Sequence, residues 1–200
     1  MLEDLILTLQ KEANLISGER KVLLHSLADA IRTSLNTFGS CNIIAVCTHN
    51  SRRSQLAEAW IHVMSRHLQL PAIKAYSGGT ESTAFYPLMI QAMKNCGFAL
   101  NISVEGDNPT MKLELGEKEV PHLMFSKKFD HSSNPDKNFI ALMVCSDADE
   151  NCPFIPGAFR RISLTFEDPK MYDGQPDALD RYQEKVHEIG REIIYAMGQL

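Results

Sequence analysis

The residues Asn42-Ile-Ile-Ala-Val46 are followed at once by Cys47-Thr-His-Asn-Ser-Arg-Arg-Ser54 and then by a helical pattern from Gln55 to about Leu68. Four apolar residues in a row, three of them β-branched, predict a short buried strand. The polar run after it predicts a loop, and the pattern beyond predicts a helix. This strand–loop–helix unit is typical of a parallel α/β sheet.

Further strands and helices alternate along the rest of the chain. Strands are predicted over 72–76, 139–144 and 162–166, and helices over 87–96 and 177–197. The 139–144 run is continuously apolar, as expected for a strand buried on both faces. We therefore expect an α/β fold with a four-stranded parallel sheet flanked by helices.

Two segments depart from this alternation. Residues 2–15 and 19–36 predict two helices, so residues 1–40 are expected to form an N-terminal helical extension to a catalytic domain over 41–200. Residues 106–137 interrupt the rhythm as an insertion before the third strand. Within that insertion, residues 111–125 fit a hairpin that turns at Gly116-Glu117.

Composition excludes several classes of protein. The chain has 200 residues, of which 44% are apolar and 22% charged, enough for one globular core rather than a disordered chain. A net charge of −5 and a pI near 5.8 argue against a nucleic-acid partner. No apolar run approaches the roughly 20 residues that span a bilayer, and Glu3 and Asp4 stand where a signal peptide carries positive charge. We expect a cytoplasmic protein without a membrane partner.

The five cysteines are Cys41, Cys47, Cys96, Cys145 and Cys152. An odd number without a secretion signal indicates reduced thiols. The chain has no C-x-x-C pair, which argues against a zinc ribbon, so neither a metal nor a cofactor is expected. Cys41 and Cys96 are interpreted as small buried apolar residues.

Chemistry is expected at the carboxyl ends of the strands, where ligands bind in open α/β sheets. The segments 47–54, 145–152 and 166–169 all fall at such ends. In the first, backbone N–H groups and the dipole of the following helix favour a tetrahedral oxyanion. The same field is expected to lower the pKa of Cys47 toward neutrality. Arg53 can hold two anion oxygens, Ser54 can bond the sulfur, and Asn50 can brace the loop. The candidate oxyanion-binding residues are Thr48, His49, Asn50, Ser51, Arg52, Arg53 and Ser54.

The stretch from Cys47 to Glu58 resembles the signature of the low-molecular-weight protein tyrosine phosphatases and of the related thioredoxin-coupled arsenate reductases. The similarity extends over roughly 41–105 and 138–197. It includes Ser77-Gly-Gly-Thr80 and the pair Asp168-Pro169. The resemblance implies the sheet expected above and assigns Asp168 as a general acid.

The segment Cys145-Ser-Asp-Ala-Asp-Glu-Asn-Cys152-Pro153 resembles the redox segment of the arsenate reductases, whereas phosphatases of the family lack this cysteine pair. The resemblance implies that Cys47 attacks arsenate, that a disulfide passes from Cys47–Cys145 to Cys145–Cys152, and that a thioredoxin-like reductant restores the thiols. The segment must then be mobile, because one rigid geometry cannot serve both disulfides. Asp147 and Asp149 are interpreted as solvated loop residues.

Departures from the family pattern leave alternatives open. His49 stands where a glycine is usual; if the loop needs a positive φ there, the cost is modest, because His tolerates that region better than most residue types. Arg52 stands where a cysteine is usual, and it either attracts a dianion or faces solvent. The alternative function is a phosphatase that forms a phosphocysteine at Cys47 and acts on a phosphotyrosine protein, with Tyr172 as the one ring beside the acid. A non-catalytic oxyanion-binding or redox-sensing protein is a third hypothesis.

Overall fold

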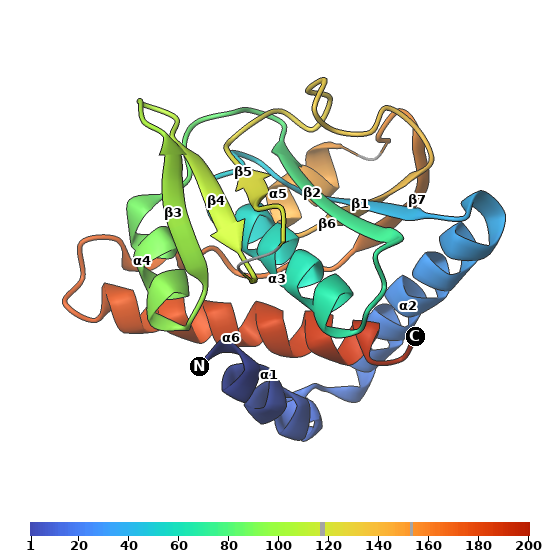
Figure 1. The fold of residues 1–200 in the computed structure, drawn as a ribbon, viewed down its shortest axis with the longest axis horizontal. Helices are drawn as coiled ribbons and strands as arrows, with labels where there is room; N and C mark the ends of the chain where they lie inside the picture. Colours follow the sequence, from blue (N-terminus) through green and yellow to red (C-terminus); the bar gives the residue numbers. More distant parts are fainter. Residues whose placement is uncertain (117–118, 153) are drawn as a thin grey trace.

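The central sheet confirms the expected fold class. The computed structural model describes residues 1–116, 119–152 and 154–200. Four strands, β1 (Cys41–Cys47), β2 (Ile73–Gly79), β6 (Phe139–Met143) and β7 (Ala158–Ser163), form a parallel sheet in the order β2-β1-β6-β7. Strand β1 lies inside the sheet, and its residues from Ile43 to Val46 are fully buried. Figure 1 shows this sheet flanked by helices.

The position of the last strand differs from the prediction. It was expected over 162–166 but runs from Ala158 to Ser163. This strand forms the edge of the sheet, so one side meets solvent and Arg160 and Arg161 are tolerated in its middle. The apolar residues Leu164 and Phe166 beyond it are buried, which is why they resembled strand residues.

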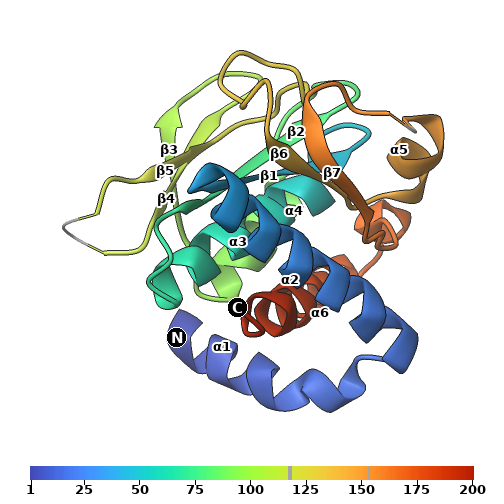
Figure 2. The ribbon, with the colours of Figure 1, turned by 90° about the vertical axis from the view of Figure 1, so that its right-hand side faces the viewer.

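The helices are α1 (Leu2–Lys11), α2 (Gly18–Phe38), α3 (Arg53–His67), α4 (Pro87–Asn95) and α6 (Ala178–Met197). The helix expected over 2–15 ends at Lys11 and continues as the 3₁₀ turn η1 (Glu12–Leu15). Helix α6 packs against α1, α2, α3 and α4, and Figure 2 shows α1 as the layer farthest from the sheet. No helix within the described ranges is both long and apolar enough to cross a bilayer.

A second, smaller sheet lies beside the first. Strands β3 (Ala99–Val104), β4 (Thr110–Glu114) and β5 (His122–Met124) are antiparallel neighbours in that order. The predicted hairpin is confirmed as β4–β5, although the expected turn at Gly116-Glu117 includes a residue outside the described ranges. Strand β3 was missed, even though its alternating Leu100, Ile102 and Val104 carry the period of a strand.

Two short helical segments follow the carboxyl ends of the central strands. Helix α5 (Ser146–Asn151) comes directly after β6, where the sequence led us to expect an irregular mobile loop. The 3₁₀ turn η2 (Pro169–Tyr172) follows β7, and the Asp168 side chain caps it by accepting a bond from Lys170 N. These two segments frame the loop after β1.

Candidate active site

The three segments singled out in the sequence meet at the carboxyl edge of the central sheet. Cys47 ends β1, Cys145 follows β6, and Asp168 follows β7. A hollow of about 660 Å³ adjoins this edge, lined by Asp168 and by residues next to Cys47 and Cys145 rather than by the two cysteines themselves. Its lining comes from all three segments: Thr48, His49, Arg53, Asp147, Glu167, Asp168, Lys170 and Met171.

The Cys47 thiol lies at the floor of this edge, against the N-terminus of α3. Cys47 as a whole is only 4% exposed to solvent. The sulfur accepts a hydrogen bond from Asn50 N at 3.1 Å and lies 3.0 Å from Ser54 Oγ. The first N–H groups of α3 have no partner within their own helix, so they are available to an anion above the sulfur.

Asn50 fixes the loop and the direction of its hydrogen bonds. Its Oδ1 accepts a bond from Lys127 N at 2.8 Å, so its Nδ2 is the donor to both Ser54 Oγ and Ser77 Oγ, each at 2.8 Å. Ser54 therefore accepts from Asn50 and keeps its own proton for Cys47. The positive φ considered for His49 lies instead at Asn50, with φ of 47°, a residue type that tolerates this region.

Glu58 anchors the same network from below. Its buried carboxylate accepts a bond from Ser77 Oγ at 2.5 Å and lies 2.9 Å from His122 Nε2. Burial alone would raise the pKa of Glu58, but the charge of Lys127 and the bonds from His122 and Ser77 outweigh it and hold this pKa below its ordinary value. Sequence reasoning did not assign a role to Glu58, His122 or Lys127. The one available signal was an acid on the buried face of α3.

The ionisation of Cys47 differs from the expectation. Burial raises the pKa of this thiol, and the neighbouring Cys145 adds to the rise. The bonds from Ser54 and Asn50 and the charge of Arg53 lower the pKa without outweighing burial. The predicted shift toward neutrality is therefore wrong for this arrangement, because the same close packing that orients the sulfur also removes water from it.

Arg53 and Asp168 form an ion pair beside the hollow. Arg53 Nη2 donates to Asp168 Oδ2 at 2.5 Å, and Arg53 Nη1 donates to Phe166 O at 2.8 Å. Arg53 is buried, while a third of the Asp168 side chain is exposed toward the hollow. The structure thus brings the expected anion-binding fork and the expected acid into direct contact.

Arg52 follows neither alternative considered for it. Its guanidinium lies 3.7 Å from the centre of the Tyr86 ring, and it donates to Tyr182 Oη at 2.6 Å and to Asp173 Oδ2 at 2.7 Å. The side chain is 11% exposed, so it does not face solvent, and it does not line the hollow. Among the expected oxyanion ligands, Arg52 can therefore contribute its backbone N–H but not its guanidinium.

The other expected ligands occupy distinct places in the loop. His49 lies at the mouth of the hollow with 46% of its side chain exposed, 3.9 Å from the Glu81 carboxylate. Ser51 is buried, and its carbonyl accepts a bond from Tyr86 N. Thr48 lines the hollow and reaches the neighbouring segment, because its Oγ1 lies 3.4 Å from Cys145 Sγ.

The remaining cysteines separate into two kinds. Cys41 and Cys96 are buried as predicted, and burial raises the pKa of each to about 11. Cys145 is fully buried and caps α5, since its sulfur accepts a bond from Ala148 N at 3.3 Å. Cys152 ends α5 and is partly exposed. A helix of this length places their Cα atoms roughly 10 Å apart, beyond the roughly 7 Å limit of a disulfide.

Arg161 holds the far end of α5. Its Nη2 donates to Asp149 Oδ1 at 2.6 Å and to Asp149 O at 2.5 Å, and its Nε donates to Cys152 O at 3.2 Å. Ser163 Oγ donates to the other Asp149 oxygen. The interpretation of Asp149 as a solvated loop residue is therefore wrong. Asp147 is exposed, as that interpretation predicts, and it lies on the wall of the hollow.

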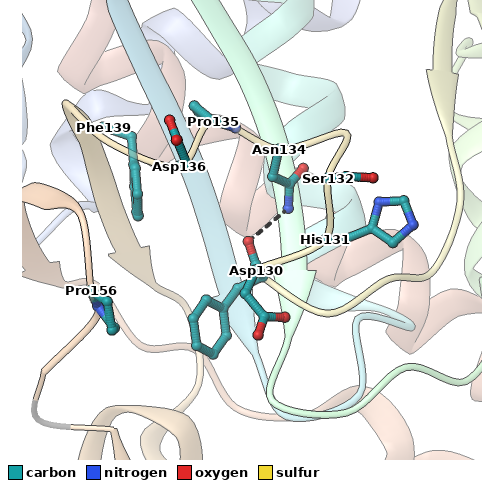
Figure 3. A pocket seen from close by; sticks show the side chains of 9 residues that line it. Asp130, His131, Ser132, Asn134, Pro135, Asp136, Phe139 and Pro156 are labelled. Atoms are coloured by element: carbon teal, nitrogen blue, oxygen red, sulfur yellow. Dashed lines mark hydrogen bonds between the residues drawn. The ribbon is translucent and has the colours of Figure 1, made fainter.

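A second pocket of about 660 Å³ lies elsewhere, between the 129–136 loop, Phe139 and Pro156 (Figure 3). It presents the carboxylates of Asp130 and Asp136 among aromatic and proline side chains. Two carboxylates disfavour an oxyanion, and none of the expected site residues lines this pocket. The candidate active site is therefore the hollow above Cys47.

Comparison with known proteins points to the same family. Residues 42–113 match the family described as low molecular weight phosphotyrosine protein phosphatase. An arsenate reductase 2 of Staphylococcus epidermidis is 31% identical over 127 residues, which are 64% of this chain and 77% of that protein. An arsenate reductase 2 of Staphylococcus saprophyticus is 30% identical over 151 residues, covering 76% of this chain and 92% of that protein. A crystal structure of a low molecular weight phosphotyrosine phosphatase from Vibrio cholerae superposes with a TM-score of 0.56 at 15% identity, covering 80% of this chain and 96% of that one. The chain belongs to the low molecular weight phosphotyrosine protein phosphatase superfamily of enzymes.

Proposed function

We propose that the protein reduces arsenate to arsenite, with Cys47 as the nucleophile and Cys145 and Cys152 as a disulfide relay. The observation that carries this proposal is the position of Cys145, whose buried sulfur lies 3.4 Å from Thr48 Oγ1 in the loop that holds Cys47. A second thiol at that place can reach an adduct formed on the first. The named relatives are arsenate reductases, which supports the same choice.

In the first step arsenate binds over the N-terminus of α3, held by the loop N–H groups and by Arg53. Because burial raises the pKa of Cys47, the thiol proton passes to the bound arsenate dianion as the sulfur becomes anionic. As Arg53 turns from Asp168 to the arsenate, Asp168 takes up a proton from solvent. The sulfur then attacks arsenic while Asp168 gives this proton to the departing oxygen, which leaves as water. A Cys47 sulfur–arsenic bond results.

In the second step the Cys145 thiolate attacks the Cys47 sulfur. A sulfur–sulfur bond forms, the sulfur–arsenic bond breaks, and its electron pair stays on arsenic, which leaves as arsenite. Two electrons have then passed from the two thiols to arsenic. Thr48 Oγ1 contacts the Cys145 sulfur and can guide its approach.

In the third step Cys152 attacks the Cys145 sulfur and releases Cys47 as a thiolate. Helix α5 must unwind for this attack, because its ends are too far apart for a disulfide. A helix of six residues is well below the roughly 12 residues at which isolated helices become stable, so unwinding is feasible. A thioredoxin-like dithiol protein then reduces the Cys145–Cys152 disulfide, which places the cycle in a reducing compartment such as the cytoplasm.

A phosphatase is the second candidate, favoured by the size of the hollow. About 660 Å³ exceeds what a bare oxyanion needs, and Met171 offers an exposed apolar wall to a larger group such as phosphotyrosine. Tyr172 does not line this hollow, and its ring lies 5.4 Å from the Arg181 guanidinium. In this alternative, Cys47 forms a phosphocysteine that water hydrolyses with help from Asp168.

The deciding experiment couples the protein to thioredoxin, thioredoxin reductase and NADPH and follows arsenate-dependent NADPH oxidation. We expect turnover in the wild type and its loss in Cys145→Ser and in Cys152→Ser. Cys96→Ser is the matched control, because this cysteine is buried outside the relay and should retain turnover.

Three results would contradict the proposal. Absence of arsenate turnover, together with p-nitrophenyl phosphate hydrolysis that survives in Cys145→Ser, would establish the phosphatase instead. Oxyanion binding without either activity would support the sensor hypothesis. Equal activity in all three cysteine variants would exclude the relay.

A further inference from the structure

We propose that Arg20, in the N-terminal extension, is a positioning residue that holds Asp168 and Arg53 in place through the segment from Thr165 to Asp168. The proposal rests on the proposed function, because it assigns the extension a part in the same reaction. It also gives residues 1–40 a role in the activity of the domain at 41–200.

Arg20 reaches this segment from the start of α2. Its Nη2 donates to Thr165 O at 2.9 Å, and its guanidinium lies 4.7 Å from the centre of the Phe166 ring. The opposite edge of the guanidinium donates from Nε to both oxygens of Glu192 in α6, at 2.9 and 2.7 Å. The guanidinium is therefore fixed on α6, and its planar shape holds the Nη2 donor in a set direction toward the 165–168 segment.

The segment that Arg20 contacts is the one that holds Arg53 and Asp168, the two charged groups to which the proposed reaction assigns anion binding and proton transfer. Phe166 accepts a bond from Arg53 through its carbonyl, and Asp168, two residues later, pairs with Arg53 through its carboxylate. Phe166 is buried, and its N–H donates to Val144 O beside the sheet edge. A shift of this short segment would therefore move the anion fork and the proton donor together.

The extension also offers a matched control. Arg191 in α6 donates from Nη2 to Glu12 at 2.6 Å, a second half-buried ion pair between the extension and α6. Neither residue of this pair contacts the 165–168 segment in the described structure. If Arg20 served only to dock the extension, loss of either pair would have the same effect on the reaction.

The test compares Arg20→Gln and Arg20→Lys with Glu12→Gln, each alone and each in an Asp168→Asn background. Arsenate reduction and p-nitrophenyl phosphate hydrolysis are both measured, since Asp168 serves as the acid in either. We expect Arg20→Gln to lower kcat at least fivefold with a KM change under twofold, and Arg20→Lys to recover part of the loss. Glu12→Gln should leave kcat unchanged. In the Asp168→Asn background, Arg20→Gln should cause a clearly smaller loss than in the wild type, because the proton donor is already absent and only Arg53 remains to be positioned.

Hydrogen exchange at the Phe166 amide supplies a readout that does not depend on any activity. We expect at least tenfold faster exchange in Arg20→Gln and no change there in Glu12→Gln. Unchanged exchange, or losses of kcat that multiply with Asp168→Asn, would overturn the proposal. If the wild type shows neither activity, the proposed function fails while the exchange measurement still decides the role of Arg20.

Discussion

The hydrogen bonds from Arg161 to Asp149 and Cys152, which we call the α5 clamp, give a quantitative prediction about the disulfide relay. Arg161→Gln removes three hydrogen bonds from a charged donor to Asp149 and to the carbonyl of Cys152. Hydrogen bonds to charged groups contribute about 1.5–3 kcal/mol when buried. Since about a quarter of each side chain is exposed, we expect a net loss of about 1–2 kcal/mol for the whole clamp.

That loss applies to the reduced form alone, because the Cys145–Cys152 disulfide requires α5 to unwind. The disulfide should therefore become about 5–30-fold more favoured relative to the dithiol. This corresponds to a reduction potential more negative by about 20–40 mV. Equilibration with glutathione buffers, followed by thiol trapping and mass spectrometry, measures the shift.

Arg160→Gln is the control for this measurement. Arg160 is the neighbouring exposed arginine of β7. Within the described part of the chain, its guanidinium lies 5.9 Å from the centre of the Phe159 ring and has no other assigned interaction. It should leave the potential unchanged. An unchanged or less negative potential in Arg161→Gln would refute the idea that α5 must open for the second disulfide.

Three further predictions concern the sulfur and the packing around the site. Ser54→Ala removes the hydroxyl that donates to Cys47 and lowers the pKa of this thiol. Iodoacetamide should therefore modify Cys47 about 3–10-fold more slowly at pH 8, and faster modification would contradict the inferred bond direction. Burial lowers the pKa of His62 to about 3, below its ordinary 6.5, so the unfolded chain takes up this proton first and stability is lost as pH falls below 6.5. Urea unfolding should show about 1–2 kcal/mol less stability at pH 5 than at pH 6.5, and His62→Gln should remove that difference; an unaltered pH dependence in the variant would show that other groups cause it. A Cβ at Gly190 would lie 2.5 Å from the Trp60 ring, so Gly190→Ala should destabilise the protein by about 1–3 kcal/mol in urea unfolding, and wild-type stability would show that the ring can move freely.

The sequence was informative where structure depends on near neighbours. The apolar run of β1, the loop after it and the start of α3 were predicted because their signals lie within about 25 residues. The contact between Cys47 and Ser54, seven positions apart, was anticipated for the same reason. Local patterns could also identify α6, whose apolar stripe repeats at helical spacing.

What could not be predicted depends on distant residues. Arg52 meets Asp173 across 121 positions, and Arg20 meets Thr165 across 145. No periodicity encodes such pairs, so Arg52 was expected either at the anion or in solvent. The pKa of Cys47 was predicted in the wrong direction because its sign depends on burial, which only the packed structure reveals.

The central claim is tested most directly by a single turnover with arsenate in the absence of a reductant. Arsenite is quantified, and the disulfides are mapped by mass spectrometry. The account predicts one arsenite per chain, a Cys145–Cys152 disulfide in the wild type, and a trapped Cys47–Cys145 disulfide in Cys152→Ser. Arsenite formation that leaves Cys47 as a free thiol in Cys152→Ser, or no arsenite at all, would contradict it.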